Sequence, residues 1–213
     1  MLLAKLDVFS IVSTTVYLVL AFMALWGLFC IVVVWMRVAQ KRFRSEAQQG
    51  EFLEVLQETI EQKRIDEASQ MCQEDARAMP QLAHLALENR GIGYGKVRQL
   101  ILDRFQRDVL ADLEYRLSWV NTVIKSAPMV GLLGTVIGMM GAFRTLATQE
   151  SVDPTLLADD INVALRTTAC GLAIAIPLIM LMNSVSVRIR KMEDLVGAGL
   201  TRFLEIFKDF VKP

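Results

Sequence analysis

Two threonines attract attention because each is a hydroxyl within a long apolar stretch. Thr135 lies in the uncharged run 126–143, and Thr168 lies in the apolar stretch 161–187. In hydrocarbon a hydroxyl has no water to bond, so it needs a partner in its own helix or in a neighbouring one. The sequence leaves two roles open for these hydroxyls: ordinary helix packing, or a polar lining for an ion pathway.

Small residues flank both threonines at steps of three and four, which places them on one face of a helix. Such stripes allow two helix backbones to approach closely in lipid. The first stripe comprises Ala127, Gly131, Gly134, Gly138 and Gly141, and the second comprises Ala164, Thr168, Gly171 and Ala175. Pro128 and Pro177 each remove one helical hydrogen bond and permit a kink. We therefore expect two tightly packed membrane helices.

Charged side chains are scarce in the apolar stretches. No Asp, Glu, His or Lys lies within 11–36, 126–143 or 161–187. A proton relay across a bilayer normally needs a titratable group, so a partner helix would have to supply the carboxylate if this chain conducts protons. Arg144 and Arg166, expected near the outer mouth, either extend to lipid headgroups or attract an acidic group of a partner.

The apolar stretches predict an all-α integral membrane protein with three transmembrane helices and long helices that extend into a cytoplasmic helical domain. Mean hydropathy is +0.40. Basic residues follow the first and third stretches, which places the N-terminus outside and the C-terminus in the cytoplasm. Pro80 and the glycine-rich stretch 91–95 predict turns between cytoplasmic helices. The expected segments are an outer N-terminus at 1–10, membrane helices at 11–36, 119–147 and 161–187, a cytoplasmic domain at 37–118, an outer loop at 148–160 and a cytoplasmic C-terminal helix at 188–213.

No combination of residues predicts an enzyme, a metal site or a cofactor. The sequence contains no nucleophile–base–acid set, no phosphate-binding loop and no metal-ligand spacing. His84 fits a packed side chain of a helical layer, and Cys30, Cys72 and Cys170 fit reduced, inert thiols. The formal net charge is zero, and no basic tract is interleaved with aromatic residues, so no nucleic-acid partner is expected.

Two motifs resemble the MotA/TolQ/ExbB proton-channel family. The first is Ala-Pro-x-x-Gly-Leu-Leu-Gly-Thr-Val-x-Gly-Met at 127–139, and the second is Ala-Leu-x-x-Thr-Ala-x-Gly-Leu-Ala-x-Ala-Ile-Pro at 164–177. Leu117, Trp119 and Asn183 also match, and the ExbB/TolQ branch is the closer one. A MotA subunit would be longer and carry a fourth span.

The resemblance implies a pentamer in the bacterial inner membrane, surrounded by lipid, so that the outer side is the periplasm. The pentamer would enclose a dimeric, single-span ExbD/TolR-like partner whose helix carries an aspartate. Thr135 and Thr168 match the threonines that face this aspartate. Proton flow would drive motion that a TonB-like or other envelope effector receives. The sequence departs from the family at Val163, where a glutamate is common, and at Lys125 and Arg166, where small or neutral residues are common.

Three alternatives to this energy-transducing subunit follow from the same residues. A membrane scaffold would use tight helix packing only to cluster cytoplasmic partners. A flagellar or gliding stator subunit would drive a different machine. A self-sufficient ion channel would need flux without a partner, which the missing titratable groups disfavour. The ion, proton or sodium, is not determined by a hydroxyl-lined path alone.

Overall fold

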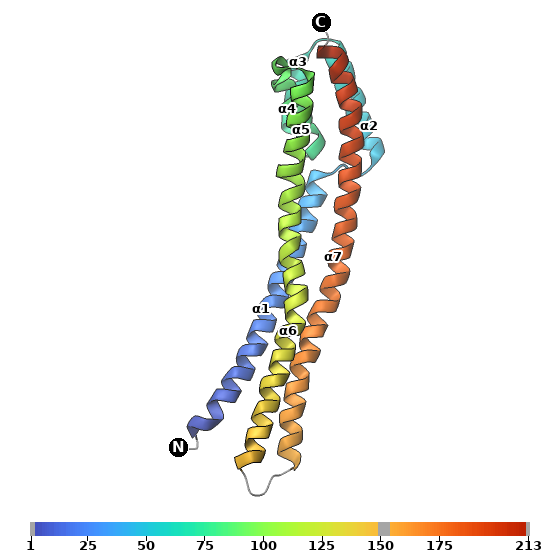
Figure 1. The fold of residues 1–213 in the computed structure, drawn as a ribbon. Coiled ribbons are helices and arrows are strands. Elements are labelled where there is room, and N and C mark those ends of the chain that lie inside the picture. The colour runs from blue at the N-terminus through green and yellow to red at the C-terminus, as the bar shows by residue number, and fades with distance from the viewer. Residues whose placement is uncertain (1–2, 149–153, 212–213) are drawn as a thin grey trace. The chain divides into compact units, whose positions relative to one another are not determined.

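The computed structural model describes residues 3–148 and 154–211, in which all regular structure is helical. A series of short helices connects the first of three long helices to the second (Figure 1). The elements are α1 (Leu3–Lys41), α2 (Glu46–Glu61), α3 (Ile65–Glu74), α4 (Ala78–Glu88), the 3₁₀ helix η1 (Arg90–Ile92), α5 (Tyr94–Arg104), the π-helix η2 (Phe105–Leu110), α6 (Ala111–Thr148) and α7 (Pro154–Val211).

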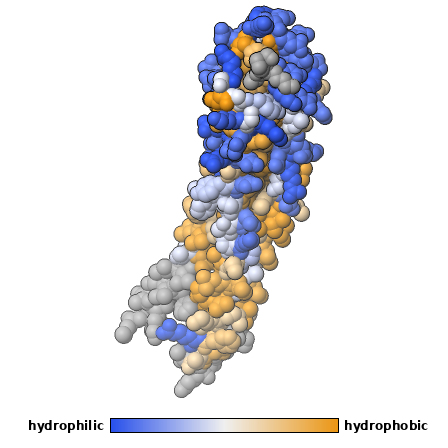
Figure 2. Space-filling model, turned by 45° about the horizontal axis from the view of Figure 1, so that its top comes forward, coloured by the Kyte–Doolittle hydropathy of each residue, from blue (hydrophilic) through white to orange (hydrophobic). Residues whose placement is uncertain are grey.

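The chain divides into two compact units, each assembled from distant parts of the sequence. The first, here called the membrane unit, comprises Met1–Val32 and Leu117–Ser184. The second, here called the polar unit, comprises Val33–Arg116 and Val185–Pro213. The surface of the membrane unit is largely apolar and that of the polar unit largely hydrophilic (Figure 2).

Three of the described helices are long and apolar enough to cross a membrane. Their stretches are Thr14–Lys41, Tyr94–Arg144 and Ile161–Phe210. Large apolar side chains remain exposed on all three, among them Phe22 on α1, Met129 on α6 and Met180 on α7. Outward-facing apolar residues suit a lipid environment. The predicted all-α membrane protein with three spanning helices is confirmed.

The long helices cross several of the predicted segment boundaries. The third span and the C-terminal segment form one helix, α7, of 58 residues. This helix begins at Pro154, seven residues before the expected span at 161, so the second part of the predicted loop is helical. Proline is favourable at the first position of a helix because its missing N–H has no partner there anyway. Residues 149–153 of the predicted loop lie outside the described residues.

A π-helical segment joins α5 to α6 without a break. Apolar residues that are buried or half-buried recur here every four residues, at Val97, Ile101, Phe105, Val109 and Leu113. In a regular α-helix, steps of four drift by about 40° each. The wider π turn absorbs an extra residue and so keeps these side chains on one face. Sequence reasoning did not predict the π segment, although the unbroken four-residue spacing was its signal.

The polar unit is built around the C-terminal part of α7 and the short helices. Ser45 caps α2, because its hydroxyl accepts from the Gln48 amide at 3.3 Å. Phe203 and Phe207 of α7 are fully buried in the core. Pro80 does not mark a turn as predicted: it lies in the first turn of α4, where proline is tolerated. The glycine turn is confirmed, since Gly93 adopts a φ of +89°.

Polar contacts join the ends of the long helices within the polar unit. The Arg37 guanidinium of α1 pairs with the Asp112 carboxylate of α6 at 2.6 Å. The Arg188 guanidinium of α7 lies 3.7 Å from the centroid of the Trp35 ring, a cation–π contact. His84 is half-buried and bonds the Ser69 hydroxyl through Nδ1 at 3.0 Å. It is therefore a packed histidine, as the sequence indicated.

Two glycines of α7 provide a matched test of packing in the polar unit. A Cβ on Gly199 would meet the Gln49 amide nitrogen and lie 3.3 Å from the Met79 sulfur, whereas a Cβ on Gly197 would meet nothing within 4 Å. Gly199→Ala should lower the free energy of unfolding by about 1–3 kcal/mol through overpacking. Gly197→Ala should raise it by about 0.5–1 kcal/mol through helix propensity. Thermal unfolding of the detergent-solubilised protein measures both, and equal effects would contradict this packing.

Candidate ion-pathway site

Helices α6 and α7 pack antiparallel through contacts too close for larger residues. A Cβ on Gly171 would lie 2.6 Å from the Ala127 carbonyl oxygen, and one on Gly138 would lie 2.6 Å from the Ala164 Cβ. Between these ends, a Cβ on Gly131 would lie 2.7 Å from the Thr167 carbonyl oxygen. Each position therefore requires glycine. The predicted close approach of two small-residue stripes agrees with this geometry.

The threonine on the contact face of α7 is Thr167, not Thr168 as the predicted stripe had it. Thr167 is only 2% exposed. Its hydroxyl lies within hydrogen-bonding distance of the Gly131 carbonyl of α6 at 3.0 Å and of the Ala164 carbonyl of its own helix at 2.7 Å. Gly134 faces the same side chain, since a Cβ there would lie 2.5 Å from the Thr167 hydroxyl oxygen. The contact stripe is thus Ala164, Thr167, Gly171 and Ala175.

The sequence did not single out Thr167, although its spacing contained the signal. Residues three and four apart share a helix face, so 164–167–171 and 164–168–171 fit equally well. Only the partner helix decides between these registers. A similar shift occurs on α6, where Ala142 is buried and the predicted stripe member Gly141 is half-buried.

Pro128 and Pro177 lie inside helices that continue past them. Proline leaves the carbonyl four residues earlier without its helical donor. Beside Pro128, the backbone of α6 approaches α7 closely, because a Cβ on Gly171 would lie 3.2 Å from the Pro128 Cα. Helix α1 packs here too, since a Cβ on Gly27 would lie 2.9 Å from a Leu178 methyl. The three helices of the membrane unit are thus in contact.

Thr135 and Thr168 are both half-buried at the margin of the contact face. The Thr135 hydroxyl donates to the Leu132 carbonyl of its own helix at 2.7 Å. The Thr168 hydroxyl oxygen is inaccessible to solvent and has no hydrogen-bond partner among the described residues. An unpartnered buried hydroxyl is uncommon in proteins because its desolvation is not compensated.

The two threonines lie on the same side of the helix pair. At about 100° per residue, Thr135 and Thr168 are each offset from the contact face of their helix by roughly 50–70° in the same rotational sense. In an antiparallel pair, equal offsets point to the same side. Gly131 lies against Thr167 and Thr168, and Thr135 is one turn further along α6. The threonines are therefore within about one helical turn of each other along the pair.

The cationic residues of the membrane unit lie elsewhere on these helices. Lys125, Arg144 and Arg166 are exposed. On the same helical projection, Arg144 and Arg166 lie on the opposite side of the α6–α7 pair from the threonines, and Lys125 lies on the outward back of α6. The structure thus does not bring the arginines together with the threonines.

The described residues hold no cluster of three or more His, Cys, Asp or Glu side chains that would suit a metal ion. The chemistry available on the threonine side is therefore that of hydroxyl groups and backbone carbonyls. These groups accept and donate hydrogen bonds but do not titrate at physiological pH. Such groups can form hydrogen bonds with a neighbouring group, but they cannot themselves take up or release a proton.

Comparison with known proteins identifies the family of this chain. The sequence pattern of the MotA/TolQ/ExbB proton channel family matches residues 34–197. The chain belongs to this family.

Several curated relatives are similar over part of the chain. The Tol-Pal system protein TolQ of Haemophilus influenzae is 36% identical over 97 residues, which cover 46% of this chain and 42% of the relative. TolQ of Pseudomonas aeruginosa is 43% identical over 89 residues, which cover 42% of this chain and 37% of the relative. The biopolymer transport protein ExbB of Helicobacter pylori is 38% identical over 74 residues, which cover 35% of this chain and 51% of the relative. The matched segments thus span about half or less of these relatives.

Thr167 provides the test of the α6–α7 contact. Thr167→Val keeps the shape of the side chain but removes the hydroxyl, and should destabilise the membrane unit by about 0.6–2 kcal/mol. Thr167→Ser keeps the hydroxyl and should retain most of the interhelical hydrogen bond. The measurement is the midpoint of thermal unfolding in detergent, and a serine variant no more stable than the valine variant would contradict a role for this bond.

Proposed function

We propose that this chain is the channel-forming subunit of a motor driven by the proton-motive force in the bacterial inner membrane. Several copies, five by the family resemblance, would surround the helices of an ExbD/TolR-like dimer. The N-terminus would lie in the periplasm and the C-terminus in the cytoplasm. The partner would carry force to an envelope process such as transport or envelope maintenance, through a TonB-like or other effector.

The observation that carries this proposal is the unpartnered hydroxyl of Thr168. Its oxygen is hidden yet makes no hydrogen bond to a described residue, while the residue as a whole is half-buried. A rotation about χ1 would turn this hydroxyl towards the side of the helix pair on which Thr135 also lies. A carboxyl group on a neighbouring helix would then satisfy it, which neither lipid nor water in the bilayer core would do.

The requirement for a partner follows from the residues that the spans lack. No Asp, Glu, His or Lys occurs in 126–143 or 161–187, so the proton-carrying group must come from another chain. One elementary charge moving through 100 mV releases about 2.3 kcal/mol, which suffices to drive a conformational step. Arg144 and Arg166, which lie away from the threonines, would extend to lipid headgroups.

Replacing both hydroxyls tests the motor directly. Thr135→Val combined with Thr168→Val should abolish energy transduction, because the partner's carboxyl group loses its hydrogen-bonding partners, while the protein still assembles. Thr135→Ser with Thr168→Ser should retain most activity. The readout is proton flux into proteoliposomes that contain this chain and its single-span partner.

Thr122 offers a matched control, since its hydroxyl is exposed and donates to the Ser118 carbonyl of its own helix at 2.9 Å. Thr122→Val should leave flux unchanged. Full activity of the double valine variant would instead favour a scaffold, in which the membrane helices only cluster partners. Flux without any single-span partner would favour a self-sufficient channel.

A further inference from the structure

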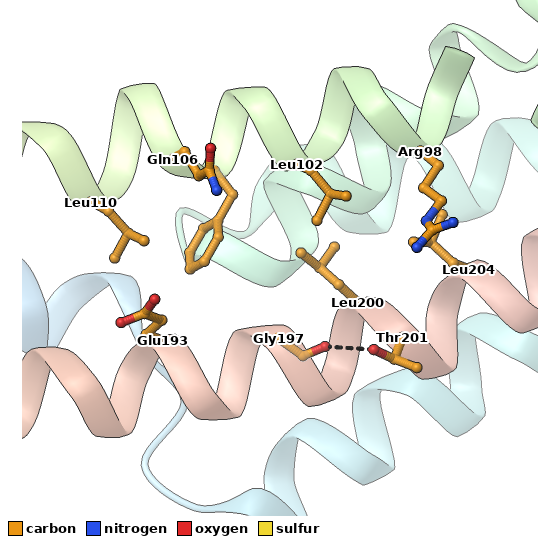
Figure 3. A pocket seen from close by; sticks show the side chains of 10 residues that line it. Arg98, Leu102, Gln106, Leu110, Glu193, Gly197, Leu200, Thr201 and Leu204 are labelled. Atoms are coloured by element: carbon orange, nitrogen blue, oxygen red, sulfur yellow. Dashed lines mark hydrogen bonds between the residues drawn. The ribbon is translucent and has the colours of Figure 1, made fainter. Parts of the chain in front are cut away.

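A groove runs along α7 in the polar unit, outside the ion-pathway site. It has a volume of about 270 Å³ and lies between α7 on one wall and α5 with the π-helix η2 on the other. Four leucines and Phe105 give its walls their apolar part. Charged groups lie at the two ends, with Arg98 at the end near Leu204 and Glu193 at the end near Leu110 (Figure 3). Leu102 is 40% exposed within it, so the groove presents apolar surface that this chain leaves uncovered.

Helix α2 presents an outer face of complementary character. On the side of the helix away from α7, exposed residues recur at helical spacing, with one apolar residue between two acids: Glu51, Val55 and Glu58. Val55 is 43% exposed. The basic residue Arg44, also exposed, directly precedes the Ser45 cap at the start of this helix. The face therefore runs from a positive end through an acidic stretch with an apolar centre.

These two surfaces lie on opposite faces of α7. Helix α2 contacts the residues 195, 199 and 202, because the Gln49 side-chain amide donates to the Leu195 carbonyl at 2.7 Å and faces Gly199, and Glu54 pairs with Arg202 at 3.4 Å. The groove is lined by residues 193, 197, 200, 201 and 204. At about 100° per residue the two sets are half a turn apart.

The two surfaces also lie at the same level along α7. The groove and the contact between α7 and α2 both involve residues between 193 and 204. Helix α2 runs in the same direction as α7, because Gln49 lies beside Leu195 and Glu54 beside Arg202. Arg44 therefore falls near the level of Glu193, and Glu58 falls beyond Arg202, near the level of Leu204 and Arg98.

We propose that the groove receives the outer face of α2 from a second copy of this chain. Val55 of one copy would cover Leu102 of the next. The charges then match in order, with Arg44 opposite Glu193 and Glu58 opposite Arg98. Copies in one bilayer share a single orientation, so two surfaces at equal level on opposite faces meet without tilting. Such a contact joins unlike surfaces, so it can repeat from copy to copy, and it closes into a ring where the rotation between neighbouring copies is a whole fraction of a turn.

This inference rests on the proposed homo-oligomer and specifies one of its contacts. Val55→Cys combined with Leu102→Cys tests it in the full chain, in membranes, with Cys30 and Cys170 replaced by alanine. Burial raises the pKa of the Cys72 thiol to about 12, so that cysteine can stay. A short bis-maleimide linker should give a ladder of covalent dimers and larger species. A link within one chain is excluded because residues 55 and 102 lie on opposite sides of α7.

Two controls separate the proposed contact from random collision. Each single-cysteine variant should give no ladder, because the contact brings residue 55 to residue 102 and not to itself. Asp103 is exposed on the side of α5 away from the groove. The pair Val55→Cys with Asp103→Cys should therefore give at least about fivefold less cross-linked product than the pair Val55→Cys with Leu102→Cys.

A charge exchange tests the order of the pairs. Arg98→Glu or Glu58→Arg alone should reduce the cross-linked fraction by about fivefold, because each places like charges together. The double variant Arg98→Glu with Glu58→Arg should recover the cross-linked fraction. Arg98→Glu with Asp103→Arg should not recover it. Failure of the combined variant to recover would overturn the proposed pairing.

The outcomes separate this contact from the function as a whole. Native mass spectrometry that shows an oligomer, together with no link between 55 and 102, would overturn the groove contact and leave the motor intact. A monomer in the native membrane extract would overturn both. Cross-linking of Leu102→Cys to the single-span partner would also overturn it, because the groove would then hold another occupant.

Discussion

The close contact between α6 and α7 is the constraint on which the rest of the membrane unit depends. Gly131, Gly138 and Gly171 meet the opposite backbone or a methyl group at distances that exclude any side chain. In lipid there is little hydrophobic driving force between helices, so close van der Waals contact and interhelical hydrogen bonds supply the association. The Thr167 hydroxyl adds one such bond and defines the register.

That register has a consequence for the neighbouring positions. With Thr167 turned into the contact, Thr168 is placed at its margin, on the same side as Thr135. The hidden hydroxyl of Thr168 has no hydrogen-bond partner among the described residues. The chain that carries it belongs to the MotA/TolQ/ExbB proton channel family.

Helix α7 serves a different purpose in the polar unit, where it separates two surfaces. One face of the helix is occupied by α2 through Gln49, and the other borders the groove. Burial of Phe203 and Phe207 fixes its rotation within the unit, since large side chains in a packed core adopt few positions. The same rotation decides which residues are available to another copy.

The sequence by itself determined the helical class, the three apolar spans, the small-residue stripes and the lack of a titratable group, because these follow from composition and from a period of three to four residues. It did not decide which of Thr167 and Thr168, or of Gly141 and Ala142, is buried in the helix contact. It also did not predict the π segment or the start of α7 at Pro154. Residues at i+3 and i+4 share a helix face equally well, so only the neighbouring helix decides which one is buried. The groove and the outer face of α2 likewise became visible only in the tertiary structure, because they join residues that are far apart in the chain.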